Sequence, residues 1–286
     1  MQYFGVVLFV GLRDFLRKPI TLTLFFAGYD EANTGAVRLA ATRTMLEDGL
    51  NGHEINAEKR RKVVLWLAKF GFSTRELLSH MLGVAVEGQA AFFKRLAEDE
   101  ITKEAYVSGT RKRVVTLTPD GVRQAKIYEP ALAIKNFKKF PLHTLIHGYT
   151  IQSFLISQKG VQGFYSEAEL ATQTFVRRPD LIIVNESGIK IAIEVELTQK
   201  DVNRIYYNFG GHVQDWQKQK FSHVIYLFSS PTVRDHYDEL YQKNPWPKFI
   251  SATSNVRHIT RAGSFDPSNV HNHGLIYFHQ FDSYVL

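Results

Sequence analysis

Two short apolar runs that contain or directly follow carboxylates constrain the fold of this chain most strongly. The first run, Leu181–Val184, directly follows Asp180, and the second, Lys190–Leu197, contains Glu194 and Glu196. Both runs are rich in β-branched residues and a turn of Asn, Glu, Ser and Gly lies between them, so they predict a hairpin in a buried sheet. Because strand side chains alternate between faces, we expect Glu194 and Glu196 on one face, and strand pairing to bring Asp180 close to Glu194.

Carboxylates inside strands this apolar cost free energy unless a cation or another partner satisfies them. Three oxygen donors at a sheet edge, with the ammonium group of Lys200 nearby, suit Mg²⁺ or Mn²⁺ and a phosphodiester substrate. The metal would polarise a phosphoryl oxygen and lower the pKa of a bound water, and Lys200 would stabilise the developing negative charge or orient that water. The predicted metal ligands are Asp180, Glu194 and Glu196.

A second interpretation of these residues needs no metal. The two glutamates then lie on a half-exposed strand face and form ion pairs with Arg177, Arg178 or Lys200. The spacing of the residues alone leaves both interpretations open.

The composition excludes several classes of protein and indicates one class of partner. The 286 residues include no cysteine, which excludes disulfide scaffolds, zinc fingers, thiol catalysis and iron–sulfur clusters, and fits a reducing, cytoplasmic location. Residues 51–150 carry 17 basic and 10 acidic side chains, so the whole net charge of +7 lies in this segment. A basic segment beside neutral ones is typical of a module that docks on a polyanion, although a solvated lysine-rich surface is the alternative.

The most apolar stretches of the chain lie near its N-terminus. Val6–Leu12 and Leu22–Ala27 are each far shorter than the ~20 apolar residues that span a bilayer. We therefore expect no integral membrane segment, and we expect these stretches to pack onto the body of the protein.

The basic segment has the pattern of a compact DNA-binding module. Helices are predicted over 58–70, 73–82 and 87–97, the second of them opened by a capping box from Ser73 to Glu76. Two β-capable runs, 101–107 and 111–117, flank a Ser-Gly turn and predict a hairpin, after which Thr118 and Pro119 open another helix. Three short helices followed by a hairpin with a basic tip resemble a winged helix-turn-helix domain.

This resemblance predicts which side chains meet DNA. The third helix would enter the major groove and the hairpin would contact phosphates. The expected DNA-binding residues are Lys94 and Arg95 on the helix and Arg111, Lys112 and Arg113 on the hairpin. Winged helices also serve as protein-docking modules, which is the alternative.

The second half of the chain predicts an α/β sheet. Helices are expected over 142–157, over 201–217 with an interruption at Gly210-Gly211, and over 232–242, with a buried strand at 223–228. Tyr206 and Tyr207 raise the possibility of cleavage through a tyrosine that becomes joined to DNA. Aromatic residues at helical spacing more often belong to a core, and the histidine cluster usual for that route is absent from the sequence.

The acidic motif resembles a known nuclease family. Pro179-Asp180, followed by Glu194 on the next strand, is similar to the PD-(D/E)XK pattern of restriction endonucleases, except that Glu196 stands where that pattern has its lysine. The form Glu-x-Glu-x-x-x-Lys, ending at Lys200, instead resembles the plasmid mobilization relaxases of the MobC type and the related replication-relaxation family. The resemblance covers about residues 55–240 and matches the catalytic motif at Asp180, Glu194, Glu196 and Lys200.

The resemblance implies a domain order and an activity. It implies an extension over 1–54, a winged helix over 55–130 and a restriction-endonuclease-like α/β domain over 140–286. It further implies a metal-dependent enzyme that nicks double-stranded plasmid DNA at a transfer origin, together with other relaxosome and coupling proteins. His147 matches a histidine of this family and Glu169 is a candidate fourth carboxylate, although a core role for His147 and a surface role for Glu169 are the alternatives. The competing hypothesis is a non-catalytic DNA-binding accessory protein with a degenerate nuclease fold.

Overall fold

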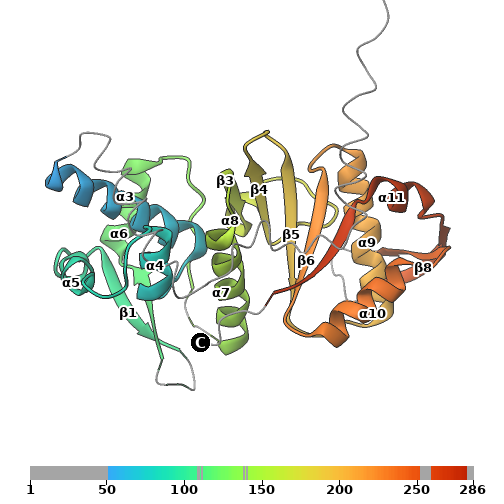
Figure 1. Ribbon diagram of the computed structural model, residues 1–286, viewed down its shortest axis with the longest axis horizontal. Helices are drawn as coiled ribbons and strands as arrows, with labels where there is room; N and C mark the ends of the chain where they lie inside the picture. Colours follow the sequence, from blue (N-terminus) through green and yellow to red (C-terminus); the bar gives the residue numbers. More distant parts are fainter. Residues whose placement is uncertain are drawn as a thin grey trace, which may run out of the picture.

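The computed structural model describes residues 51–281, apart from 108, 109, 111, 138, 140 and 252–258. The extension expected over 1–54, except for its last residues, the tip of the predicted hairpin and Arg111 therefore lie outside the described residues. The described chain has a mixed α/β fold in which helices and a small hairpin at one end lie beside a larger sheet (Figure 1). Within these ranges, no helix has both the length and the apolar character needed to cross a lipid bilayer.

The N-terminal part combines helices with one antiparallel hairpin. Its elements in chain order are α3 (Gly52–Phe70), α4 (Arg75–Met81), α5 (Ala90–Glu98), β1 (Thr102–Tyr106), β2 (Arg113–Leu117) and α6 (Pro119–Tyr128). β1 pairs with β2 as expected from the sequence. The side chain of Thr118 caps α6 by accepting a hydrogen bond from the backbone N–H of Gly121 (3.1 Å), which confirms the predicted start of this helix. α3 ends at Gly71, whose φ of 80° is a left-handed conformation that glycine adopts without strain.

The first helix starts earlier than the sequence analysis expects. α3 begins at Gly52 rather than at position 58, because Asn51 and Glu54 form a capping box there. The Asn51 side chain accepts from the backbone N–H groups of His53 and Glu54, and the Glu54 carboxylate accepts from the Asn51 N–H. These reciprocal bonds satisfy amides that would otherwise lack partners at the helix end.

The predicted capping box at the start of the second helix is wrong in its first residue. Thr74, not Ser73, caps α4, by accepting a hydrogen bond from the Leu77 N–H (3.2 Å). The backbone of Ser73 instead exchanges hydrogen bonds with Val115 of β2 (3.0 and 2.8 Å). Ser73 therefore joins the helices to the hairpin.

A five-stranded sheet forms the centre of the C-terminal part. The strand order is β3–β4–β5–β6–β9, in which β3, β4 and β5 are antiparallel and β5, β6 and β9 are parallel. The sheet and its helices comprise, in chain order, α7 (Leu142–Ser157), β3 (Val161–Ser166), α8 (Glu167–Leu170), β4 (Leu181–Asn185), β5 (Lys190–Glu196), α9 (Val202–Gln217), β6 (His223–Phe228), α10 (Pro231–Tyr241), α11 (Ser268–His273) and β9 (Ile276–Gln280). A separate hairpin, β7 (Trp246–Ser251) and β8 (Ile259–Phe265), precedes α11.

The two faces of this sheet bury different sets of residues. Odd-numbered residues of β4 and β5 pack against α7 in one hydrophobic cluster, and even-numbered residues pack with α9 and α10 in another. Glu194 and Glu196 are even-numbered, and their register partners in β6 are Tyr226 and Phe228 of the second cluster. The expected shared face is confirmed, but it is buried rather than half-exposed, since Glu194 is 1% and Glu196 is 3% exposed.

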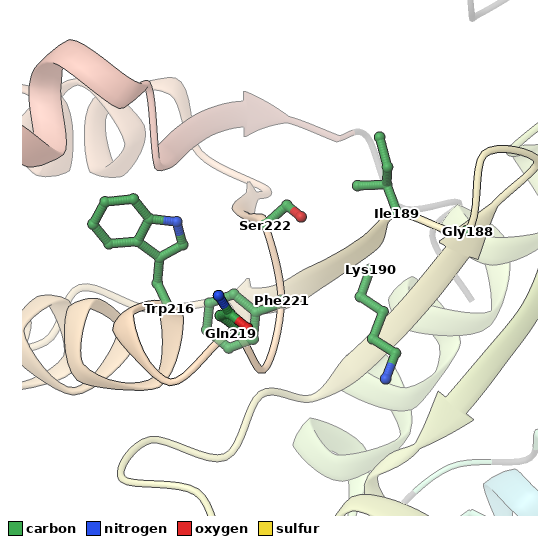
Figure 2. A pocket seen from close by; sticks show the side chains of 7 residues that line it. All are labelled: Gly188, Ile189, Lys190, Trp216, Gln219, Phe221 and Ser222. Carbon is green, nitrogen blue, oxygen red and sulfur yellow. The ribbon is translucent and has the colours of Figure 1, made fainter.

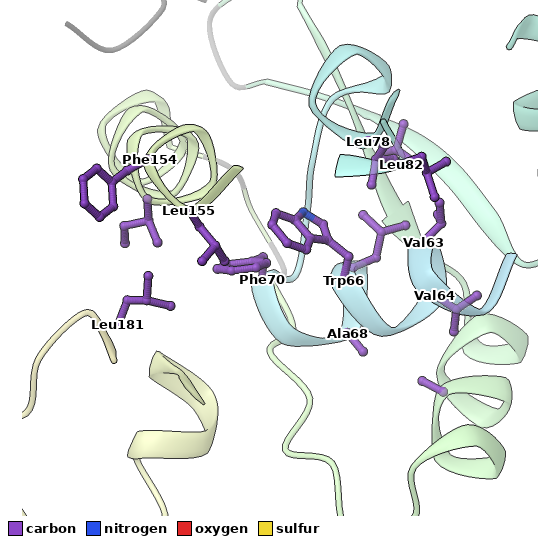
Figure 3. Packing of buried hydrophobic residues seen from close by; sticks show 14 of the residues in the cluster. Val63, Val64, Trp66, Ala68, Phe70, Leu78, Leu82, Phe154, Leu155 and Leu181 are labelled. Carbon is purple, nitrogen blue, oxygen red and sulfur yellow. The ribbon is translucent and has the colours of Figure 1, made fainter. Parts of the chain in front are cut away.

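The N-terminal helices and the sheet share one hydrophobic cluster. Trp66 and Phe70 of α3 belong to the same cluster as Phe154 of α7 and Leu181 of β4 (Figure 3). The indole N–H of Trp66 donates to Gln152 of α7 (2.8 Å), whose amide nitrogen donates to the backbone carbonyl of residue 72 (3.0 Å). Apolar burial and these two buried hydrogen bonds join the two halves of the described chain.

α9 is continuous, whereas the sequence predicts an interruption at Gly210 and Gly211. A Cβ atom on Gly211 would lie 2.7 Å from the Cβ of Arg177, while a Cβ on Gly210 would meet nothing within 4 Å. Because Gly211 has no side chain, α9 can approach the segment before β4 closely at this position. Gly211 does not end the helix.

Candidate functional site

Asp180 lies at the start of β4 and contacts the neighbouring strand. Its backbone N–H donates to the carbonyl of Ile193 (3.0 Å), and its Oδ2 accepts from the N–H of Val195 (2.8 Å). Its carboxylate is thus held against the β5 backbone between Glu194 and Glu196, as strand pairing predicts.

His147 of α7 is the hydrogen-bond partner of Asp180. Its Nε2 donates to Asp180 Oδ2 (3.1 Å). Burial works to lower the pKa of His147, but the hydrogen bond and charge of Asp180 outweigh it, so this pKa lies above its ordinary value. Burial likewise works to raise the pKa of Asp180, and the bonds from His147 and Val195 bring it below its ordinary value. The structure therefore brings these two predicted site residues together in a hydrogen bond.

Glu194 lies between two basic side chains. Arg177 Nη2 donates to its Oε2 (2.6 Å). The Nε2 of His212 lies 3.2 Å from Oε1, but not along a hydrogen-bond direction, so the contact is electrostatic. The ion pair with Arg177 is one that the metal-free interpretation of the sequence names.

Glu196 pairs with Lys200, one of the catalytic residues predicted from the sequence. The Lys200 ammonium contacts Glu196 Oε1, and it is the more exposed partner at 24%, against 3% for the glutamate. Burial raises the pKa of Glu196 to about 7, because the loss of hydration outweighs the attraction of Lys200. Ionisation of Glu196 is therefore more costly in the folded protein than in water.

The three carboxylates do not form one ligand group. In the described part of the chain, no three His, Asp or Glu side chains are arranged so that they could hold a metal ion. Each carboxylate instead has a basic partner of its own: His147 for Asp180, Arg177 for Glu194 and Lys200 for Glu196.

Glu169 lies in a different environment from the acidic residues of the hairpin. It completes a capping box with Ser166 at the start of α8 and accepts a hydrogen bond from Lys69 of α3 (2.7 Å). Its contacts therefore join α8 to the N-terminal helices, and the structure does not bring it to the other predicted carboxylates.

The tyrosine-linked alternative is not supported at Tyr206. This side chain is 4% exposed, and its hydroxyl donates to the carbonyl of Leu240 (3.1 Å). Burial raises its pKa above the ordinary value, which makes the phenolate harder to form. Tyr206 is a core residue of the second hydrophobic cluster.

Sequence reasoning missed two buried polar residues of α9. His212 and Asp215 are both fully buried. His212 contacts Glu194, and Asp215 accepts a hydrogen bond from the backbone N–H of Arg177. The available signal was their i, i+3 spacing among aromatic residues, which places them on the inward face of the helix.

The predicted DNA-binding residues of α5 lie at the surface. Phe93 and Leu96 form the buried face of the helix, while Lys94 and Arg95 are exposed. Lys94 Nζ lies 3.3 Å from Glu98 one turn further on, in an ion pair that water screens.

The hairpin carries its basic residues close to an exposed aromatic ring. Lys112 and Arg113 are exposed, and Arg113 donates to Glu104 of β1 (2.9 Å). The Arg113 guanidinium also lies 5.0 Å from the ring centroid of Tyr106, which is 63% exposed. Arg111 lies outside the described residues.

A surface pocket of about 460 Å³ lies at the other end of β5 (Figure 2). It is lined by Gly188, Ile189, Lys190, Trp216, Gln219, Phe221 and Ser222. Lys190 is the first residue of β5, so roughly 13 Å of strand separates it from Glu194 and roughly 20 Å from Glu196. The pocket is not part of the acidic site.

Comparison with known proteins gives little help with this chain. No family model matches it, and no curated protein matches it. Among solved structures, the apo form of a double mutant of ZitR from Lactococcus lactis is similar at 20% identity, over 36% of this chain and 73% of that one, with a TM-score of 0.24. A likeness of this size carries no conclusion about fold or function.

Proposed function

We propose that this protein is a site-specific, metal-dependent DNA endonuclease of the relaxase type, with a winged-helix domain followed by a nuclease-like domain. One observation carries the proposal: the paired strands β4 and β5 bring Asp180 to the backbone between Glu194 and Glu196, with Lys200 directly on Glu196. Carboxylates and a lysine at one end of a buried hairpin are the groups that phosphodiester hydrolysis uses. The transfer origin, single-strand cutting, and relaxosome and coupling proteins as partners rest on the sequence resemblance.

The chemistry of the donor set suits Mg²⁺ or Mn²⁺, which prefer hard carboxylate oxygens. Glu194 Oε1 is buried and accepts no hydrogen bond from the described residues, so it retains capacity to bind a cation. Asp180, Glu194 and Glu196 would hold the ion, which supplies Lewis-acid activation of the phosphate. In the described residues these carboxylates do not form one ligand group, so the proposal requires Asp180, Glu194 and Glu196 to leave their basic partners and to converge on the ion.

The basic partners have a function in the same proposal. Arg177 and Lys200 are 27% and 24% exposed, so each connects a buried carboxylate with solvent. Once released from a glutamate, a guanidinium or ammonium group beside the site stabilises negative charge on a phosphodiester. The exposed basic residues of α5 and of the β1–β2 hairpin would bind the duplex through its phosphates.

A plasmid-nicking assay tests the proposal. Supercoiled plasmid that carries the cognate origin, incubated with protein and Mn²⁺, should become relaxed, and chelation with EDTA should prevent this. Asp180→Asn and Glu194→Gln should abolish relaxation. Glu186→Gln is the matched control, because Glu186 is an exposed carboxylate in the turn of the same hairpin. Relaxation by both site variants at the wild-type rate would reject the assignment.

The non-catalytic accessory protein is the second candidate, and the ion pairs favour it. Each carboxylate already has a basic partner, and Glu196 replaces the lysine of the simple nuclease motif. Titration calorimetry with Mn²⁺ separates the two candidates. Binding that Glu194→Gln removes supports the nuclease, whereas heat-silent wild-type protein that still binds duplex DNA supports the accessory role.

A further inference from the structure

The inward face of α9 carries polar groups that a packing role does not explain. Asn208, His212 and Asp215 lie on one face at i, i+4 and i+7, and they are 2%, 0% and 0% exposed. The same helix contributes Phe209 and Val213 to the second hydrophobic cluster. Burying three polar side chains beside such a cluster costs free energy unless each has a hydrogen-bonding or charged partner that offsets the lost hydration.

Asp215 fixes the backbone before β4. Its Oδ1 accepts from the N–H of Val176 (3.0 Å) and its Oδ2 from the N–H of Arg177 (2.8 Å). Two charge-assisted hydrogen bonds from consecutive amides hold a segment that has no regular secondary structure of its own. Gly211 lies one turn earlier on α9, where a side chain would collide with Arg177.

His212 and Arg177 contact Glu194 from different directions. Arg177, whose backbone Asp215 holds, donates to Glu194 Oε2 (2.6 Å). His212 comes directly from α9, with its Nε2 3.2 Å from Oε1. Each oxygen of the buried carboxylate thus faces a different basic group, and α9 determines the place of both groups.

We propose that His212 and Asp215 are positioning residues of the acidic site: His212 orients the carboxylate of Glu194, and Asp215 fixes the backbone of Arg177 while its guanidinium stays free to leave the glutamate. Asp215 acts through the backbone of Arg177, and His212 acts on the carboxylate itself. The contacts stand independently of any activity, and their effect on DNA cleavage rests on the proposed function.

The first experiment tests the contact without activity. Nitrogen-15 NMR at one fixed pH records the ring nitrogens of His212 in the wild type, in Glu194→Gln and in Glu186→Gln. We expect the His212 resonances to move in Glu194→Gln, because the charge beside Nε2 is lost, and to stay in place in Glu186→Gln. Resonances that do not move in Glu194→Gln would overturn the proposal.

The second experiment tests the positioning role in the nicking assay with Mn²⁺. His212→Gln keeps a donor about as far from the backbone as Nε2, whereas His212→Leu has none. We expect His212→Leu to lose about 10- to 100-fold in kcat with little change in KM for DNA, as supporting residues of metal sites typically do. His212→Gln should recover most of this loss.

Thermal melting of both His212 variants identifies any loss of folding. An equal loss of kcat in folded His212→Gln and His212→Leu contradicts the positioning role. Wild-type protein that binds DNA but does not nick it contradicts the proposed function, and the NMR comparison alone then decides whether His212 holds Glu194.

Discussion

At the scale of single residues, the acidic site is a set of charges that burial makes costly. Glu194 and Glu196 lie two positions apart on one strand face and are both almost fully buried, yet they meet different partners. Lys200 contacts Glu196 from a half-buried position, whereas Arg177 and His212 contact Glu194. Protonation of Glu196, whose pKa burial raises to about 7, should therefore be measurable near neutral pH.

Glu196 should make the folded state less stable as the pH rises. Its pKa of about 7 in the folded state lies above the ordinary 4.5, so its contribution is fully present below pH 4.5 and is lost as the pH rises through 7. Glu196→Gln lacks this titrating group. Between pH 4.5 and 7, its free energy of unfolding should therefore rise relative to that of the wild type by up to about 1.4 kcal/mol per pH unit. Urea unfolding at several pH values measures the difference. A difference that does not vary with pH would contradict the prediction.

The pKa of His147 should depend on Asp180. In the wild type it lies above 6.5, because the hydrogen bond and charge of Asp180 outweigh burial. In Asp180→Asn the charge is lost while burial remains, so the pKa should fall below 6.5. NMR titration of the His147 ring measures both values, with exposed His143 of the same helix as internal control. Equal values in the two proteins would show that Asp180 does not set this pKa.

At the scale of elements, α9 determines where the residues before β4 lie. It packs its apolar side chains against the sheet, and it places Gly211 and Asp215 against the segment that contains Arg177. One helix thus covers a hydrophobic face and holds a charged segment at the same time.

Two adjacent glycines allow a matched test of this packing. Alanine at either position should raise helix propensity by about 1 kcal/mol. At Gly210 the new methyl group meets open space, so Gly210→Ala should stabilise the protein. At Gly211 it would lie 2.7 Å from the Cβ of Arg177, so Gly211→Ala should destabilise it, by about 1–3 kcal/mol as in other overpacked sites. Urea unfolding compares the two, and an equal gain in both would show that α9 does not approach Arg177 this closely.

The sequence predicts elements where the pattern is local and misses what depends on distant packing. The β4–β5 hairpin and the start of α6 follow from β-branched runs and from Thr118 with Pro119, and the structure confirms both. The sequence analysis does not predict β7, β8 or β9. For β9 the reason is that it pairs in parallel with β6, a strand about fifty residues earlier, so no turn motif marks the pairing. The pairing of Asp180 with β5 can be predicted from the strand register. The contacts of His212 cannot, because they depend on how α9 packs against the sheet.

At the scale of the whole molecule, the N-terminal helices and the sheet of the described chain share one core. Their apolar residues form a shared cluster, and Gln152 bridges Trp66 with the chain after α3. Lys69 and Lys135 add ion pairs to Glu169 and Glu167 across the same contact. Stability of either half should therefore depend on the other.

Trp66→Ala tests this dependence. Removing a large buried aromatic side chain typically costs about 3–5 kcal/mol, and the indole N–H that bonds Gln152 is lost with it. We expect hydrogen exchange to show lower protection in β4 and β5 as well as in α3, because one cluster holds them all. A loss of protection confined to residues before α7 would contradict this dependence.

The bridge through Trp66 and Gln152 has a consequence for any duplex that spans both ends of the molecule. Under the proposed function, the shared cluster and these hydrogen bonds would hold α5 and the acidic residues at one offset from each other. A duplex that met α5 and the β4–β5 hairpin together would have to fit that offset by bending, and flexible base steps between the two contacts would favour its binding.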